Sequence, residues 1–134
     1  MVEVEHGSMK DLKLGKYVMI DEVPCRVVGI DVSAPGKHGA AKMRVTAIGV
    51  FDGNKKILLK PSDADIQVPI IERKRGQIVT LNGDVAQVMD LTTFETFEMI
   101  IPEDLKATAE SGKEVEYMET MGRKMIMKVA SEER

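Results

Sequence analysis

A short basic stretch in the first half of the chain carries the residues best suited to chemistry. Lys37 and His38 stand between Gly36 and Gly39, and Pro35 comes just before them. Proline followed by glycine favours a tight turn, and the second glycine frees the backbone again three residues later. We therefore expect Lys37 at the tip of a projecting hairpin loop that spans residues 33–42 and packs against nothing.

The charge of this loop and of the residues that follow it is positive. No acidic residue occurs between Asp31 and Asp52, whereas Lys42 and Arg44 follow the loop. An unbalanced basic segment of this kind is a plausible contact for the phosphates of a nucleic acid. Composition alone supports a plainer interpretation equally well, because hairpin loops are often rich in glycine, proline and lysine when they are solvated.

A second basic cluster follows the turn signal at Asp52 and Gly53. Lys55 and Lys56 begin this cluster, and Lys60 ends it. We consider it as a second phosphate contact, with an exposed strand face as the alternative.

Other kinds of site receive little support from the sequence. One cysteine excludes an intramolecular disulfide, and two histidines make a structural zinc site improbable. Glu114, Glu116 and Glu119 resemble paired carboxylates for acid–base chemistry, but we interpret them as a solvated strand face. An RNA-cleaving enzyme acting through His38 stays open as a third hypothesis, although no acidic partner is patterned beside it.

The segments around the loop alternate as β-strands do. In residues 25–32, Cys25, Val27 and Gly29 fall on one face, and Arg26, Val28, Ile30 and Val32 fall on the other. Residues 43–51 alternate in the same way, so the loop is expected to join two strands. Further short strands are predicted at residues 17–20, 55–59, 66–72, 77–81, 84–91, 94–101, 114–119 and 124–129.

Three local features interrupt this pattern of strands: a turn, a helix and a run of charges. Asn82 and Gly83 predict a type I′ hairpin turn, in which both central residues need positive φ. Pro102 to Gly112 predicts one short helix of about nine residues, opened by proline and closed by glycine. The charge run from Arg73 to Gly76 is the candidate domain boundary.

The tally of short strands predicts an all-β chain of 134 residues built from two small barrels. We place the first domain at residues 9–73 and the second at 76–134, and we treat residues 1–8 as an added leader outside the fold. Residues 1–75 carry a net charge of +3 and residues 76–134 carry −6. This asymmetry suggests that only the first domain faces an anionic partner.

The loop resembles the modification loop of the translation factor 5A family, the hypusine-containing factors. That loop reads Gly-Lys-His-Gly followed shortly by Ala-Lys, which Gly36 to Gly39, Ala41 and Lys42 match. The resemblance extends over nearly all of residues 9–130. Ala34, Pro35 and Ala40 are similar to the archaeal branch of the family.

The resemblance implies an SH3-like barrel followed by an OB-fold with one short helix. It implies that deoxyhypusine synthase transfers an aminobutyl group from spermidine to Lys37, giving deoxyhypusine or hypusine, with no separate cofactor. The factor would then bind the ribosome, contact rRNA and peptidyl-tRNA, and promote peptide-bond formation at stalled sequences, without being an enzyme. His38, Lys42, Arg44, Lys55 and Lys56 would be auxiliary RNA contacts. A cytoplasmic monomer without membrane contact is expected, and the alternative is a general RNA-binding module that acts without modification.

Overall fold

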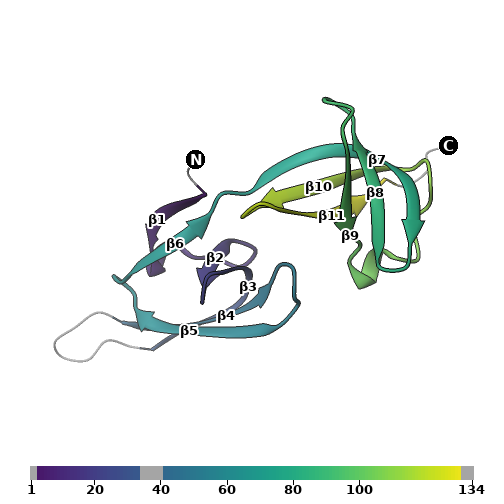
Figure 1. The fold of residues 1–134 in the computed structure, drawn as a ribbon. Helices are drawn as coiled ribbons and strands as arrows, with labels where there is room; N and C mark the ends of the chain where they lie inside the picture. The colour runs from purple at the N-terminus through teal and green to yellow at the C-terminus, as the bar shows by residue number, and fades with distance from the viewer. Residues whose placement is uncertain (1–2, 34–40, 131–134) are drawn as a thin grey trace. The chain divides into compact units, whose positions relative to one another are not determined.

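The computed structural model describes residues 3–33 and 41–130, and these are almost entirely β-structure (Figure 1). This confirms the all-β prediction. The strands are β1 (Val4–Ser8), β2 (Tyr17–Ile20), β3 (Val23–Ser33), β4 (Lys42–Gly49), β5 (Lys55–Pro61), β6 (Asp65–Pro69), β7 (Glu72–Asn82), β8 (Val85–Asp90), β9 (Thr96–Ile100), β10 (Glu114–Thr120) and β11 (Arg123–Val129). Two 3₁₀ helices, η1 (Met9–Asp11) and η2 (Glu103–Leu105), accompany them.

The chain divides into two compact units, residues 1–70 and 71–134. The division falls a few residues before the charge run that we had taken as the boundary. Arg73, Lys74 and Arg75 lie inside β7, where they pair with β10, so they form part of a strand and not a linker. The run is polar because β7 is solvated there, which sequence alone does not distinguish from a linker.

The first unit contains a four-stranded antiparallel sheet in the order β2-β3-β4-β5 and a two-stranded sheet of β1 and β6. Apolar residues of these elements and of η1 form one core, which the alternation of β3 and β4 supplies on one face of each strand. Its buried members are Met9, Leu12, Val18, Ile20, Cys25, Val27, Met43, Val45, Ala47 and Ile66. Cys25 is fully buried, as expected of a small core residue.

The alternation predicted for β3 fails halfway along the strand. The register with β4 shifts between Val27 and Gly29, so Val28 is the extra residue of a β-bulge. Beyond the bulge the faces exchange: Gly29 opposes Thr46, and Ile30 packs against the core. Our assignment of Ile30 to the face of Arg26 was therefore wrong.

The start of the chain belongs to the fold, contrary to our expectation for residues 1–8. Val4–Ser8 forms β1, which pairs antiparallel with β6 from Val4 opposite Pro69 to Ser8 opposite Asp65. Pro69 lies at the end of β6, as its missing N–H predicts. The segment lacks alternation because both strands of this small sheet leave side chains partly exposed.

The second unit is a closed five-stranded barrel in the order β10-β11-β9-β8-β7. Its core contains Ile78, Ala86, Val88, Met99, Ile101, Ala109, Val115, Tyr117 and Ile126. A sheet that closes on itself leaves fewer strand edges open, which suits a small domain with few aromatic residues.

Two local predictions for this unit were wrong in detail. The β7–β8 turn contains Gly83 and Asp84, because Asn82 still pairs with Val85. Only Gly83 has a positive φ, +65°, which agrees with a type II′ turn and not with the type I′ turn we predicted.

The predicted helix of about nine residues is a single 3₁₀ turn, Glu103–Leu105, continued by irregular turns. The Thr108 hydroxyl donates to the Leu105 carbonyl oxygen (3.1 Å), and Lys113 Nζ donates to the Thr108 carbonyl oxygen (2.9 Å). The Leu105 carbonyl oxygen also accepts the N–H groups of Thr108 (3.2 Å) and Ala109 (3.1 Å), so the chain makes one further turn after η2 without continuing as a regular helix. So short a segment bears the full free-energy cost of helix nucleation.

Candidate functional site

The loop we predicted to carry Lys37 connects two strands that remain paired up to its base. Ser33, the last residue of β3, pairs with Lys42, the first residue of β4, and the Ser33 hydroxyl donates to the Lys42 carbonyl oxygen at 3.3 Å. The Ser62 N–H donates to the Ala41 carbonyl oxygen at 2.7 Å. The predicted loop residues Pro35, Gly36, Lys37, His38 and Gly39 lie outside the described residues.

The basic residues nearest this base share one face of the first unit's sheet. Across β3, β4 and β5, the row Ser33–Lys42–Pro61 is followed by Asp31–Arg44–Leu59, then Gly29–Thr46–Ile57, then Arg26–Ile48–Lys55. Directly paired residues point to the same side of a sheet, and so do residues two apart on a strand. We call these four rows the outer face. The exposed cations Lys42, Arg44 and Lys55 belong to it, together with the exposed Arg26 and one exposed carboxylate, Asp31, which lies directly beside Arg44.

Lys56 does not belong to the outer face. It pairs with Ala47, a core residue, and therefore points to the opposite side of β5 from Lys55. Its charge acts on the Cys25 thiol: burial raises the pKa of Cys25, and Lys56 partly opposes that rise. Lys60 pairs with Met43, another core residue, and so lies on the same side of β5 as Lys56. Our single cluster of Lys55, Lys56 and Lys60 is therefore divided between two surfaces.

The outer face also exposes apolar side chains that we did not predict. Ile57 is 43% exposed and Leu59 is 63% exposed, and the bulge residue Val28 is 41% exposed. Leu59 lies directly beside Arg44 in the register. Apolar and basic residues do not alternate along β5, so only the pairing with β4 shows which residues face outward.

Basic residues in the second unit are used differently. Arg75 pairs with Glu114 (2.5 Å), Lys74 with Glu119 (3.0 Å) and Arg73 with Glu116 (4.0 Å), all between β7 and β10. The hydrogen bond from Lys74 lowers the pKa of Glu119. The glutamates that we read as a solvated face thus neutralise the charge run of β7.

A buried polar pair stabilises the turn that joins β8 and β9. The Tyr117 hydroxyl donates to Asp90 Oδ2 at 2.5 Å, and Asp90 Oδ1 accepts from the backbone N–H groups of Thr92 (2.7 Å) and Thr93 (2.9 Å). These bonds lower the pKa of Asp90, while burial and the same carboxylate raise that of Tyr117. Asp90 is only 4% exposed, so its role is structural.

The phenylalanines of the second unit are split between surface and core. Phe94 is 68% exposed and has a φ of +66°, so it lies outside the core. Phe97 does pack against the core, and Lys124 Nζ lies 4.2 Å from its ring centroid. A ring covered in this way is poorly placed to stack on a base.

Within residues 3–33 and 41–130, no three His, Cys, Asp or Glu residues gather as metal ligands would. No helix in this part of the chain has the length and apolar character needed to cross a membrane.

Comparison with known proteins agrees with this architecture. Residues 5–64 match the family model described as translation initiation factor 5A-like, N-terminal. Residues 70–130 match the model described as eukaryotic elongation factor 5A hypusine, DNA-binding OB fold. The two matches follow the two structural units closely.

Whole-chain relatives agree as well. Translation initiation factor 5A of Archaeoglobus fulgidus is 52% identical over 92% of this chain and 96% of its own length. The counterpart from Methanopyrus kandleri is 49% identical over 98% of both chains. A solved structure of the factor from Methanococcus jannaschii superposes with a TM-score of 0.89 at 47% identity, covering 96% of each chain.

An SH3-like unit followed by an OB-fold barrel, with a basic loop between paired strands, defines a class of two-domain translation factor. Within that class, the family models that match the two units both describe factor 5A. The chain belongs to the translation initiation factor 5A family.

Proposed function

We propose that the chain binds the ribosome and acts through a hypusine or deoxyhypusine side chain on Lys37. The modified side chain stabilises peptidyl-tRNA and promotes peptide-bond formation at stalled sequences. Deoxyhypusine synthase installs the modification from spermidine, and the factor works as a cytoplasmic monomer without catalytic chemistry of its own.

The observation that carries this proposal is the pairing of Ser33 with Lys42. It fixes both ends of the short segment that contains Gly36, Lys37 and Gly39, and this supports the proposal that the segment carries the modified lysine. Membership in a family whose model is described by hypusine supports the choice of Lys37.

The modified side chain would act through its length and through the position in which it holds its partner. An unmodified lysine is a single charge on a four-carbon stem, whereas an added aminobutyl group lengthens it and supplies a second amine. Such a side chain can contact phosphate and sugar groups in a narrow cleft. Holding a reactive end in place lowers the entropy cost of reaction, so the factor need not supply an acid or a base.

The outer face supplies the surrounding contacts in this proposal. Lys42 and Arg44 stand at and just beyond the base of the loop, and Lys55 lies two rows further on. Their exposed charges suit the phosphates of rRNA or tRNA, with His38 as a further contact from the loop.

The test is peptide synthesis on a template that encodes a proline run, using chain co-produced with deoxyhypusine synthase. We expect Lys37→Arg to abolish stimulation while its thermal unfolding midpoint equals that of the unsubstituted chain. Lys42→Arg is the matched control, because it keeps a cation at the loop base and leaves the modification site untouched. Full stimulation by Lys37→Arg would refute the proposal.

One observation favours a second candidate, a general RNA-binding module that acts without modification. The outer face is basic independently of Lys37. If this candidate is right, charge reversal at Arg44 and Lys55 weakens RNA binding in the unmodified chain as much as in the modified one. Affinity in both forms would then fall steeply with salt.

A further inference from the structure

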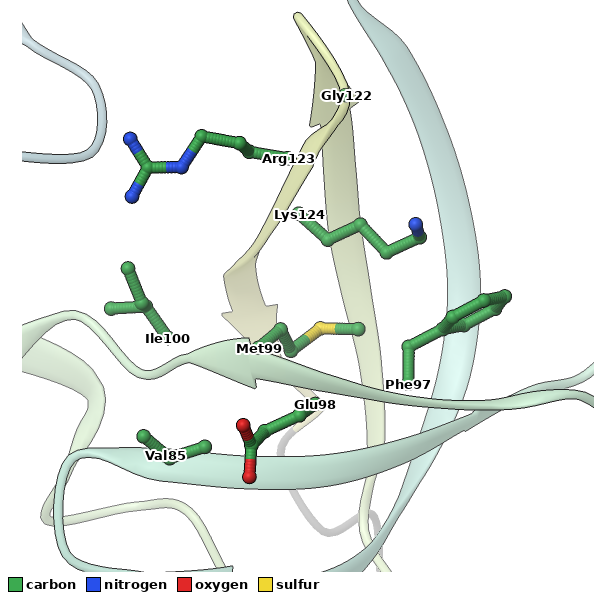
Figure 2. Close-up of a pocket in the computed structure, with 8 residues that line it drawn as sticks. All are labelled: Val85, Phe97, Glu98, Met99, Ile100, Gly122, Arg123 and Lys124. Atoms are coloured by element: carbon green, nitrogen blue, oxygen red, sulfur yellow. The ribbon is translucent and has the colours of Figure 1, made fainter.

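A pocket of about 330 Å³ opens in the barrel of the second unit, between β9 and β11 (Figure 2). Side chains from three strands and one turn surround it. They are Val85, Phe97, Glu98, Met99, Ile100, Gly122, Arg123 and Lys124.

The pocket exists because strand pairing is incomplete at this place in the barrel. β9 pairs with β8 along its whole length, from Thr96 to Ile100. On its other edge, the register pairs of the described residues include a single match with β11, Ile100 opposite Met125. The backbone of β9 before Ile100 is therefore an open strand edge inside a barrel that is otherwise closed.

The hydrogen bonds of β9 show which backbone groups face this opening. The Ile101 N–H donates to the Asp84 carbonyl oxygen (2.9 Å), and the Asp90 N–H donates to the Glu95 carbonyl oxygen (2.8 Å). Bonding direction alternates along an antiparallel strand, so the odd-numbered residues of β9 bond to β8. The N–H and C=O of Glu98 consequently point to the opposite edge, into the opening.

The side chains give the pocket an apolar wall and a charged rim. Val85 and Ile100 are half-buried, whereas Glu98 and Arg123 are exposed. Figure 2 shows Arg123 extending on the same side as Ile100. Lys124 is already engaged, since its Nζ lies over the Phe97 ring and 3.7 Å from a Glu119 carboxylate oxygen.

We propose that this opening binds an extended peptide segment of a partner protein, which adds as a strand to the free edge of β9. The Glu98 N–H and C=O supply main-chain hydrogen bonds, the usual source of affinity in strand addition. An apolar side chain of the peptide packs against Val85 and Ile100. A neighbouring basic side chain of the peptide meets Glu98, so a peptide that alternates apolar with basic residues is complementary.

The charges of the second unit favour a peptide over a nucleic acid. Residues 71–134 carry nine Lys and Arg against thirteen Asp and Glu, a net of −4. Glu98 stands on the rim of the pocket, where it would repel a phosphate backbone. A peptide backbone is neutral and meets no such repulsion. This inference does not depend on the modification of Lys37.

The test is a titration of the full chain, labelled with ¹⁵N, with a synthetic eight-residue peptide of valines alternating with lysines. We expect saturable shifts of the amide signals of Glu98 and Arg123. Glu98→Pro removes the open N–H and is expected to bind at least tenfold more weakly than Glu98→Ala, which removes only the carboxylate. Absence of saturable shifts, shifts centred outside the lining residues, or equal affinity of the two variants would overturn the proposal.

Two controls test whether main-chain pairing and a peptide partner account for the shifts. The same peptide methylated at alternate backbone nitrogens cannot complete the strand pairing, so it should bind at least tenfold more weakly even if Glu98→Pro fails to fold. A hexauridylate that shifts the same residues at lower concentration than the peptide would overturn the assignment of a peptide partner.

Discussion

The two units of this chain use their basic residues in opposite ways. In the first unit, Lys42, Arg44 and Lys55 make no side-chain ion pair with any described residue, and they share one face. In the second, Arg73, Lys74 and Arg75 each pair with a glutamate of β10. The cations of β7 are therefore engaged within the chain, whereas the cations of the outer face are available to a partner.

The comparison also corrects the charge asymmetry seen in the sequence. Once the charge run is counted with β7, residues 1–70 carry ten basic and nine acidic residues, a net of +1. The first unit is therefore nearly neutral as a whole. Its ability to attract an anion depends on the arrangement of four exposed cations, Arg26, Lys42, Arg44 and Lys55, beside the single exposed carboxylate of Asp31 on one face, more than on net charge.

Loss of the buried carboxylate in the second unit should have the largest effect on stability. Asp90→Ala leaves the Tyr117 hydroxyl and the N–H groups of Thr92 and Thr93 without their partner. We expect the free energy of unfolding to fall by about 3 kcal/mol. Denaturant unfolding measures this, and a loss below about 1 kcal/mol would mean that water replaces the carboxylate.

Charge reversal on the outer face should weaken binding without changing stability. We expect Arg44→Glu combined with Lys55→Glu to reduce ribosome affinity about tenfold, equivalent to about 1.4 kcal/mol. The slope of affinity against salt should also become shallower. Lys56→Glu is the matched control, because this neighbour points to the other side of β5. Equal loss in the control would show that the face does not define the interface.

The Asp90–Tyr117 pair should also make stability depend on pH at both extremes. The folded-state pKa of Asp90 is lowered, so its contribution is present above the unfolded value of about 4 and is lost as pH falls below it. The pKa of Tyr117 is raised, so stability falls as pH rises above about 10. Glu119 adds to the acid loss, because Lys74 lowers its pKa.

Unfolding measured across pH in Asp90→Asn and Tyr117→Phe separates these contributions. The first variant should lose part of the acid dependence, and the second should lose part of the alkaline dependence, the remainder coming from groups such as Cys25 whose pKa is also raised. Unchanged profiles in both variants would contradict the pairing.

The exposed ion pairs of β7 should have the smallest effect. The side chains of Arg75 and Glu114 are 72% and 50% exposed, so solvent screens their attraction. We expect Arg75→Ala to change the free energy of unfolding by about 0.5 kcal/mol or less. Ribosome affinity should stay unchanged, and a clear loss of affinity would extend the interface into the second unit.

The sequence predicted strands well where one face of a strand meets a core, as in β4 and β8. It did not predict the bulge at Val28, because a bulge depends on the register with a partner strand. The separation of Lys55 from Lys56 depended on the same pairing. The strand Val4–Ser8 was not predicted because both strands of its small sheet are partly solvated, so its sequence shows no alternation of apolar and polar residues.

We propose that Lys37 carries the function through a covalent addition, and peptide mass spectrometry of the loop peptide is the direct test. The loop peptide containing Lys37 is analysed from protein isolated from its native source. We expect an aminobutyl-type addition on Lys37 and on no other lysine. An unmodified Lys37 in native protein would contradict it and would leave an RNA-binding module with the same fold.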